Sequence, residues 1–269
     1  MTEKEIVDAS VALIRDHVSA IRDSIESIGK KFSLAGSPAS RKDVALARWH
    51  AYLGVMAVGA AEGVADLAPA RRTRPVIVLN RCIYEYVLTA KYFDSHRKDA
   101  FDQFASIGAR KFALVSRLDN PSPQLNLLFV NEYLEWKRTS GSRDEYSGNK
   151  QVATMHVAMA KAGDVKTDKK GNKYTSAFES VYGVPSLYVH ADPILMRDVF
   201  VAMDDDHDWR IKAEEHLLGI FGQLGLTPVY LLDFLSLIAQ RYELDRSAFA
   251  PLIARGRAIA VQIVGMGLS

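Results

Sequence analysis

The pattern of apolar and polar positions is helical along most of the chain. Near the N-terminus the apolar residues alternate steps of four and three: Val7, Val11, Ile14, Val18, Ile21, Ile25 and Ile28. This heptad spacing places them along one face of a helix, which we expect within residues 1–30, with Gly29 closing the apolar run. We interpret the face as directed into the core of the chain. The alternative is a homodimer formed through this N-terminal heptad.

Two more helices are expected before residue 95. The second covers residues 42–67 and is rich in Ala, with Gly54, Gly59 and Gly63, whose small size lets a neighbouring helix approach closely. The third opens at Pro75, because proline suits the first position of a helix, and continues to Ser95. Its first residues also fit a buried strand, but the continuing apolar pattern favours a helix.

The rest of the chain repeats this organisation. Polar breaks at residues 119–121, 139–149 and 163–173 separate further helices. We expect these helices at 99–117, 122–138, 151–162, 174–191, 211–223, 227–242 and 247–265. Two short apolar runs around an acidic turn give the one strand signal, at 197–211. The sequence therefore predicts an all-α, multi-helix bundle with a buried central helix and one short β-hairpin near 197–211.

Composition narrows the class of protein. With 269 residues, 48% of them hydrophobic, the chain can bury about three quarters of its unfolded surface, as one large domain or two small ones. A net charge of +2 excludes a strongly polybasic nucleic-acid binder and leaves room for a local basic patch. One cysteine, Cys82, excludes an internal disulfide framework and fits a reducing compartment.

We expect a cytoplasmic protein without membrane attachment. The first ten residues are charged and lack the apolar stretch of a signal peptide. The longest apolar stretches, 53–61 and 226–239, are too short to span a bilayer, and Asp233 interrupts the second.

The third helix carries the first candidate chemistry. The sequence "VIVLNRCIYEYVLTAKYF" is apolar on almost every side, which is typical of a helix buried all round. Arg81 and Glu85 nevertheless lie in its middle, four residues apart and on one face. Arg before Glu is the less favourable order for a surface pair. A buried guanidinium needs a carboxylate and further acceptors, and Glu85 supplies the carboxylate.

A second set of polar residues interrupts the apolar run "FESVYGVPSLYVHADP". Tyr182, Ser186 and His190 recur every four residues and line one face if the segment is helical. Pro185 either kinks this helix or begins it, and in the second case Tyr182 leaves the shared face. We expect Arg81 and Glu85 to contact Ser186 or His190.

These two motifs carry a resemblance. The pattern "RCIYE" at 81–85 followed by "YGVPSLYVH" at 182–190 resembles a widespread family of uncharacterised all-helical bacterial proteins. That family is remotely similar to the HEPN superfamily of helical nucleotide-binding domains and metal-independent ribonucleases, many of them in toxin and phage-defence systems. By helix order the resemblance covers residues 40–240. We therefore expect one domain, 1–269, in which the N-terminal helix 1–30 and the C-terminal helix 247–265 flank this core.

The resemblance implies RNA or a nucleotide as the partner, no cofactor and no metal. HEPN ribonucleases carry an Arg followed, after four to six residues, by a His. The match here, Arg210 with His216, is one that residue frequencies alone would produce, so it has no weight. A nuclease would have to use Arg81, Glu85 and His190 instead.

The roles in such a nuclease follow from the chemistry of RNA cleavage. His190 would take the 2′-hydroxyl proton, and Arg81 would stabilise the charge that develops on phosphorus. Glu85 would orient Arg81, while Tyr182 and Ser186 would hold the imidazole or the ribose. The alternative function is a non-catalytic helical interaction module, in which the five residues form a polar network that clamps two core helices.

The segment "RRTRP" suggests a phosphate site. Arg71, Arg72 and Arg74 precede the third helix, whose N-terminus favours anions over cations, and a bound phosphate would relieve that conflict. Alternatively, Arg71 and Arg72 cap the C-terminus of the helix before them.

Three other patterns are weaker. Ser186, His190 and Asp192 contain the residue types of a catalytic triad, but no Gly-x-Ser-x-Gly elbow accompanies them. The run "DDDHD" at 204–208 fits a solvated turn better than a metal site. Cys82 lacks a second cysteine and fits a core thiol.

Overall fold

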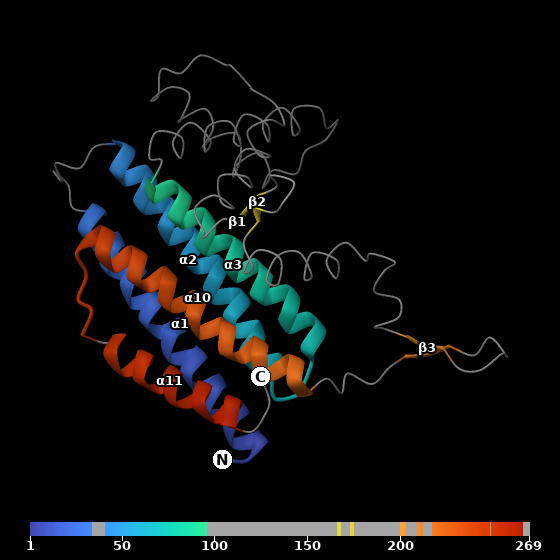
Figure 1. Cartoon of the computed structure of the whole chain (residues 1–269). Coiled ribbons are helices and arrows are strands. Elements are labelled where there is room, and N and C mark those ends of the chain that lie inside the picture. The colour runs from blue at the N-terminus through green and yellow to red at the C-terminus, as the bar shows by residue number, and fades with distance from the viewer. Residues whose placement is uncertain are drawn as a thin grey trace, which may run out of the picture.

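A computed structural model of the chain describes residues 1–33, 41–95, 166–167, 173–174, 200–202, 209–211, 217–247 and 249–265. Nearly all of this part is helical, which confirms the all-α class. The helices are α1 (Glu3–Ser33), α2 (Arg41–Leu67), α3 (Thr73–Ser95), α10 (Leu217–Tyr242) and α11 (Phe249–Gly265). Their axes run along roughly one common direction (Figure 1). The helices predicted between residues 99 and 191 lie outside the described residues, except that Tyr174, expected to begin one of them, belongs to a strand.

Helix α1 begins with a capping box and ends later than expected. The Thr2 hydroxyl accepts a hydrogen bond from the Glu5 amide, and the Glu5 carboxylate accepts one from the Thr2 amide. The predicted limit at residue 30 is wrong, because the helix continues to Ser33. The last turn is held by tertiary contacts: Phe32 packs edge-on against Tyr242 with ring centroids 5.7 Å apart. These contacts offset the low helix propensity of Gly29.

The heptad face of α1 lies in the core of its own chain. Six of its seven residues are buried, and Ile25 packs against them. They face α2, α10 and α11, which all contact α1. The interpretation as a core-facing helix therefore holds. A homodimer stays a prediction, but this face is already occupied.

Helix α10 lies at the centre of the described bundle. It contacts α1, α2, α3 and α11, and its apolar side chains supply a large part of the core. Within the described residues, Gly219–Tyr242 is the one helical segment long and apolar enough to cross a bilayer. Half of its most apolar window is buried inside the bundle, so packing accounts for that composition.

The break predicted between residues 223 and 227 is wrong. Helix α10 runs unbroken from Leu217, with Pro228 inside it, and residue 211, where a helix was expected to start, belongs to a strand. A proline in a helix interior removes one hydrogen bond and weakens the local turn. Here the buried Asn80 of α3 supports that turn. Its Nδ2 donates to the Gln223 carbonyl at 2.9 Å, and the Thr227 hydroxyl donates to its Oδ1 at 2.6 Å.

The third predicted helix is present, and in the described part of the chain its main neighbours are two other helices. Helix α3 begins at Thr73, two residues before Pro75, and packs against α2 on one side and α10 on the other. Residues along its whole length are buried, among them Val76, Ile83 and Phe93.

The three glycines of α2 differ in their surroundings. A Cβ at Gly54 would lie 2.8 Å from Ile25 Cδ1, and one at Gly63 would lie 2.9 Å from Leu79 Cδ1. These two glycines therefore permit the close helix packing that the sequence indicated. A Cβ at Gly59 would meet no atom within 4 Å. Close packing among the described residues does not explain Gly59.

Two short antiparallel hairpins complete the described structure. Strands β3 (Phe200–Ala202) and β4 (Trp209–Ile211) pair with Val201 opposite Arg210, which confirms the hairpin predicted for 197–211. Strands β1 (Lys166–Thr167) and β2 (Lys173–Tyr174) form a second one, which apart from Tyr174 lies in the segment 163–173 that the sequence marked only as a polar break.

Candidate functional site

The Arg81–Glu85 pair lies in the middle of α3, as the sequence indicated. Arg81 Nη2 donates to Glu85 Oε1 at 3.0 Å. The Arg81 side chain is 9% exposed and the Glu85 side chain 27%. The guanidinium is therefore held almost out of water, while the carboxylate keeps an edge open to solvent. The four-residue spacing on one helix fixes their relative position.

Two half-buried side chains flank this pair on α3. Burial raises the pKa of the Cys82 thiol, and the Glu85 carboxylate raises it further. Because the thiol rather than the thiolate is favoured, Cys82 is not an activated nucleophile, in agreement with a core thiol. Burial also raises the pKa of the Tyr86 phenol, with smaller contributions from Cys82 and Tyr52. Both side chains are therefore neutral at physiological pH.

The other half of the predicted site lies outside the described residues. This applies to Tyr182, Ser186 and His190, and to Pro185 and Asp192 near them. The expected contact of Arg81 and Glu85 with Ser186 or His190 stays a prediction. The acidic turn at 204–208 and His216 also lie outside the described residues.

The arginines of the predicted phosphate site lie where α2 gives way to α3. Arg71 has a positive φ of 54°, and its Nη2 donates to Glu3 Oε2 of α1 at 3.1 Å. The backbone amide of Arg72 donates to the Leu67 carbonyl at 3.2 Å, which helps to close the end of α2. The capping thus comes from the backbone of this segment. Arg71 and Arg72 are exposed and Arg74 is half-buried, and phosphate binding by the three stays a prediction.

A buried polar cluster that the sequence analysis missed lies at one end of the bundle. His50 of α2 is fully buried, and its Nδ1 lies 2.8 Å from the Tyr242 hydroxyl of α10. Its Nε2 lies 3.2 Å from the Ala90 carbonyl of α3. A carbonyl only accepts, so Nε2 carries the proton and Nδ1 accepts from Tyr242. Burial lowers the pKa of His50, against smaller opposing effects of the Ala90 carbonyl and Asp94.

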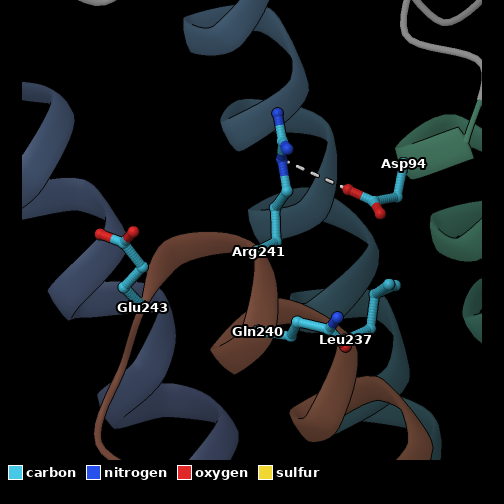
Figure 2. Close-up of a pocket in the computed structure, with 5 residues that line it drawn as sticks. All are labelled: Asp94, Leu237, Gln240, Arg241 and Glu243. Carbon is cyan, nitrogen blue, oxygen red and sulfur yellow. Dashed lines mark ion pairs between the residues drawn. The ribbon is translucent and has the colours of Figure 1, made fainter.

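The same end of the bundle contains a cavity of about 370 Å³, lined by Asp94, Leu237, Gln240, Arg241 and Glu243 (Figure 2). Arg241 Nε lies 3.3 Å from Asp94 Oδ1, the ion pair drawn in Figure 2, and Arg241 Nη2 lies 3.6 Å from Asp43 Oδ1. Two carboxylates therefore balance the one guanidinium. The cavity does not offer a free cation to an anionic ligand.

Comparisons with known proteins add no assignment: no family model, no curated protein and no solved structure matches the chain. Within the described ranges, no group of three or more His, Cys, Asp or Glu side chains could hold a metal ion. The candidate site is therefore supported by the geometry of Arg81 and Glu85 and by the sequence motif that combines residues 81–85 with residues 182–190.

Proposed function

We propose that this chain is a HEPN-like protein that handles nucleic acid or a nucleotide, specifically a metal-independent ribonuclease of a bacterial defence or toxin system acting in the cytoplasm. The observation that supports the proposal is the Arg81 guanidinium, 9% exposed and held at 3.0 Å by Glu85 in the middle of an apolar helix. A cation fixed in advance in a poorly solvated place stabilises developing charge far better than one that is free in water.

The proposed reaction is cleavage of RNA through its own 2′-hydroxyl. His190 takes the 2′-hydroxyl proton and the 2′-oxygen attacks phosphorus. The bond to the 5′-oxygen then breaks, and that oxygen takes up a proton, directly from the imidazolium or through water, to leave a 2′,3′-cyclic phosphate and a 5′-hydroxyl. Arg81 neutralises the charge on the phosphorane while Glu85 keeps the guanidinium in place. Tyr182 and Ser186 orient the imidazole or the ribose.

The test compares wild-type protein with His190→Gln on total RNA. Glutamine keeps hydrogen-bonding capacity and approximate size but cannot act as a base near neutral pH. We expect folding and RNA binding to survive while cleavage falls by about 100-fold or more, the usual contribution of a positioned acid–base group. Adding a chelator should leave the wild-type rate unchanged.

His17→Gln is a matched control. His17 is buried on α1, where its Nδ1 lies 2.8 Å from the Leu13 carbonyl. This variant should cleave RNA at the wild-type rate per folded molecule. Equal losses in the two variants would mean that His190 acts through stability, which would contradict the catalytic role.

The alternative proposal is a non-catalytic helical interaction module. Exposed apolar side chains on the outer side of α2, namely Tyr52, Val55 and Met56, favour it. A wild-type protein that neither binds nor cuts RNA would exclude the ribonuclease and leave this module as the function.

A further inference from the structure

One face of α2 points away from the bundle and combines apolar, cationic and small residues. We name it the α2 outer face: it consists of Arg48, Tyr52, Val55, Met56 and Gly59, all exposed. The exposed fractions of the three apolar side chains are 54% for Tyr52, 57% for Val55 and 37% for Met56. Steps of three and four residues put them in one row along the helix. A contiguous apolar row of this kind is typical of a contact surface.

Gly59 gives an independent indication that another molecule covers this face. Glycine in a helix interior is destabilising relative to alanine. Gly54 and Gly63 are explained by side chains that pack within 3 Å of their missing Cβ atoms, but the space above Gly59 is open. Packing among the residues that the structure describes therefore does not require a glycine there. A glycine would be required if a side chain from a second molecule packed into the space left by the missing Cβ of Gly59, which we call the notch.

We propose that the α2 outer face binds the same face of a second copy of this chain, with the two α2 helices antiparallel about a two-fold axis. The order of residues along the face is self-complementary. If Tyr52 of one copy lies over Gly59 of the other, the symmetry places Val55 against Met56 in both directions. Tyr52, the largest side chain of the face, then packs over Gly59, which has no side chain. Val55 and Met56 form the centre of the contact between the two helices, which we call the seam.

The charges on α2 favour the antiparallel direction. In this register Arg48 lies opposite Gly63 of the second copy, with Glu62 and Asp66 on either side. Their side chains are 43% and 73% exposed and pair within the chain with Arg22 and Arg15. Arg48 is exposed and forms no ion pair in the part of the chain that the structure describes. A parallel arrangement would instead place Arg48 against Arg48.

The size of the seam predicts its strength. Stable interfaces bury about 1,200–2,000 Å² in total, more than one pair of helices across four turns provides. We therefore expect a dimer that forms and dissociates with concentration. The proposal is independent of the ribonuclease, because it uses neither Arg81 nor His190. The heptad face of α1, the first candidate surface for a homodimer, lies in the core. The α2 outer face gives a homodimer another surface.

The test is sedimentation equilibrium of the full chain over a range of concentrations. Wild-type protein should associate, and Val55→Glu should weaken association by at least about tenfold, because it places two carboxylates at the centre of the seam. Val261→Glu is the matched control: Val261 is 67% exposed on α11, far from the proposed seam in sequence and on another helix. It should associate like the wild type.

A charge exchange tests the direction of the helices. Asp66→Arg should weaken association, because it faces Arg48 of the second copy, and adding Arg48→Glu should restore it. Both variants lose the Arg15–Asp66 pair equally, so comparing them isolates the contact between copies. A wild-type chain that stays monomeric at every concentration overturns the proposal. So does association of Val55→Glu at wild-type strength, which would place any dimer on a different surface.

Discussion

At the scale of single residues, Glu85 is what makes a guanidinium tolerable in the middle of α3. Arg81 is nearly excluded from water, and a cation left there without its carboxylate would keep the cost of desolvation and lose the attraction. Local sequence could predict this pair, because both partners lie on one helix and the spacing alone places them together. Partners on other helices depend on packing that no local pattern specifies.

Removing the carboxylate gives the first prediction for this scale. Glu85→Ala should lower the free energy of unfolding by about 3 kcal/mol, the lower end for a broken buried pair, because the Glu85 side chain is partly exposed. Chemical denaturation measures the change. Replacing both residues, Arg81→Met with Glu85→Leu, should restore most of the loss, because the buried cation is then removed together with its carboxylate.

A surface pair with the same spacing is the control. Glu26 and Lys30 of α1 are also four residues apart, 4.0 Å from each other, and both are well exposed. Glu26→Ala should cost no more than about 0.5 kcal/mol. If Glu85→Ala costs as little as Glu26→Ala, water solvates the Arg81 guanidinium and its burial has no energetic consequence.

At the scale of elements, the sequence predicted the existence of each described helix but not the extent of α1 and α10. Gly29 and the segment before Pro228 are local signals for a helix end, yet both helices continue. In each case a distant residue decides the outcome: Tyr242 packs on the last turn of α1, and Asn80 supports α10 beside its proline. Tertiary contacts thus overrode a low helix propensity, which costs about 1 kcal/mol for a glycine and about 3 kcal/mol for a proline in a helix interior.

The His50 cluster could not be predicted for the same reason. His50 and Tyr242 lie 192 residues apart, and the third partner is a backbone carbonyl of α3. A lone histidine on an apolar helix face is compatible with many environments. Only the packing of α2, α3 and α10 gives this one two hydrogen-bond partners and a fixed tautomer.

This cluster predicts how stability depends on pH. The pKa of His50 is lowered from 6.5 by burial, and burial lowers that of His17 as well. As pH falls below 6.5 the unfolded chain takes up protons that the folded chain does not. Stability is therefore fully present above that pH and falls as the solution is acidified, by at most about 1.4 kcal/mol per pH unit for each histidine.

Urea unfolding at pH values between about 7.5 and 5.5 would measure this dependence. A pKa difference of one unit between the folded and unfolded chain changes the free energy of unfolding by up to about 1.4 kcal/mol. His50→Gln should be less stable than wild type near neutral pH but should show a smaller loss on acidification, since of the two buried histidines in the described part of the chain only His17 then contributes. The lowered pKa values of Glu5 and Asp245 act at lower pH and do not interfere. An unchanged slope in His50→Gln would contradict this prediction, because it would show that His50 takes up a proton in the folded chain as readily as in the unfolded one.

At the scale of the whole molecule, the glycines of α2 that face the interior of the bundle differ from the one that lies on its surface. Gly54 and Gly63 serve the fold, since Ile25 and Leu79 occupy the space that a side chain would need. At Gly59, by contrast, no atom of the described residues lies within 4 Å of where a Cβ would be. Stability and association should therefore respond in opposite directions when this one position is changed, which a role in folding alone would not produce.

The last prediction uses that separation. Gly59→Ala should raise the free energy of unfolding of the monomer by about 1 kcal/mol, because alanine favours the helix and its Cβ meets no atom within 4 Å. The same methyl group fills the notch for Tyr52 of a second copy and should weaken association by about tenfold, or roughly 1.4 kcal/mol. Denaturation of dilute protein measures the first effect, and sedimentation equilibrium measures the second.

Gly54→Ala provides the contrast. A Cβ there would lie 2.8 Å from Ile25 Cδ1 and 3.0 Å from Phe234 Cε1, so the core must shift and the monomer should lose stability. Association through the α2 outer face should remain, because Gly54 points into the bundle. If Gly59→Ala instead associates as tightly as wild type, the glycine is not a docking notch. The seam would then have to be held by Val55, Met56 and the charges of Arg48 and Asp66 alone.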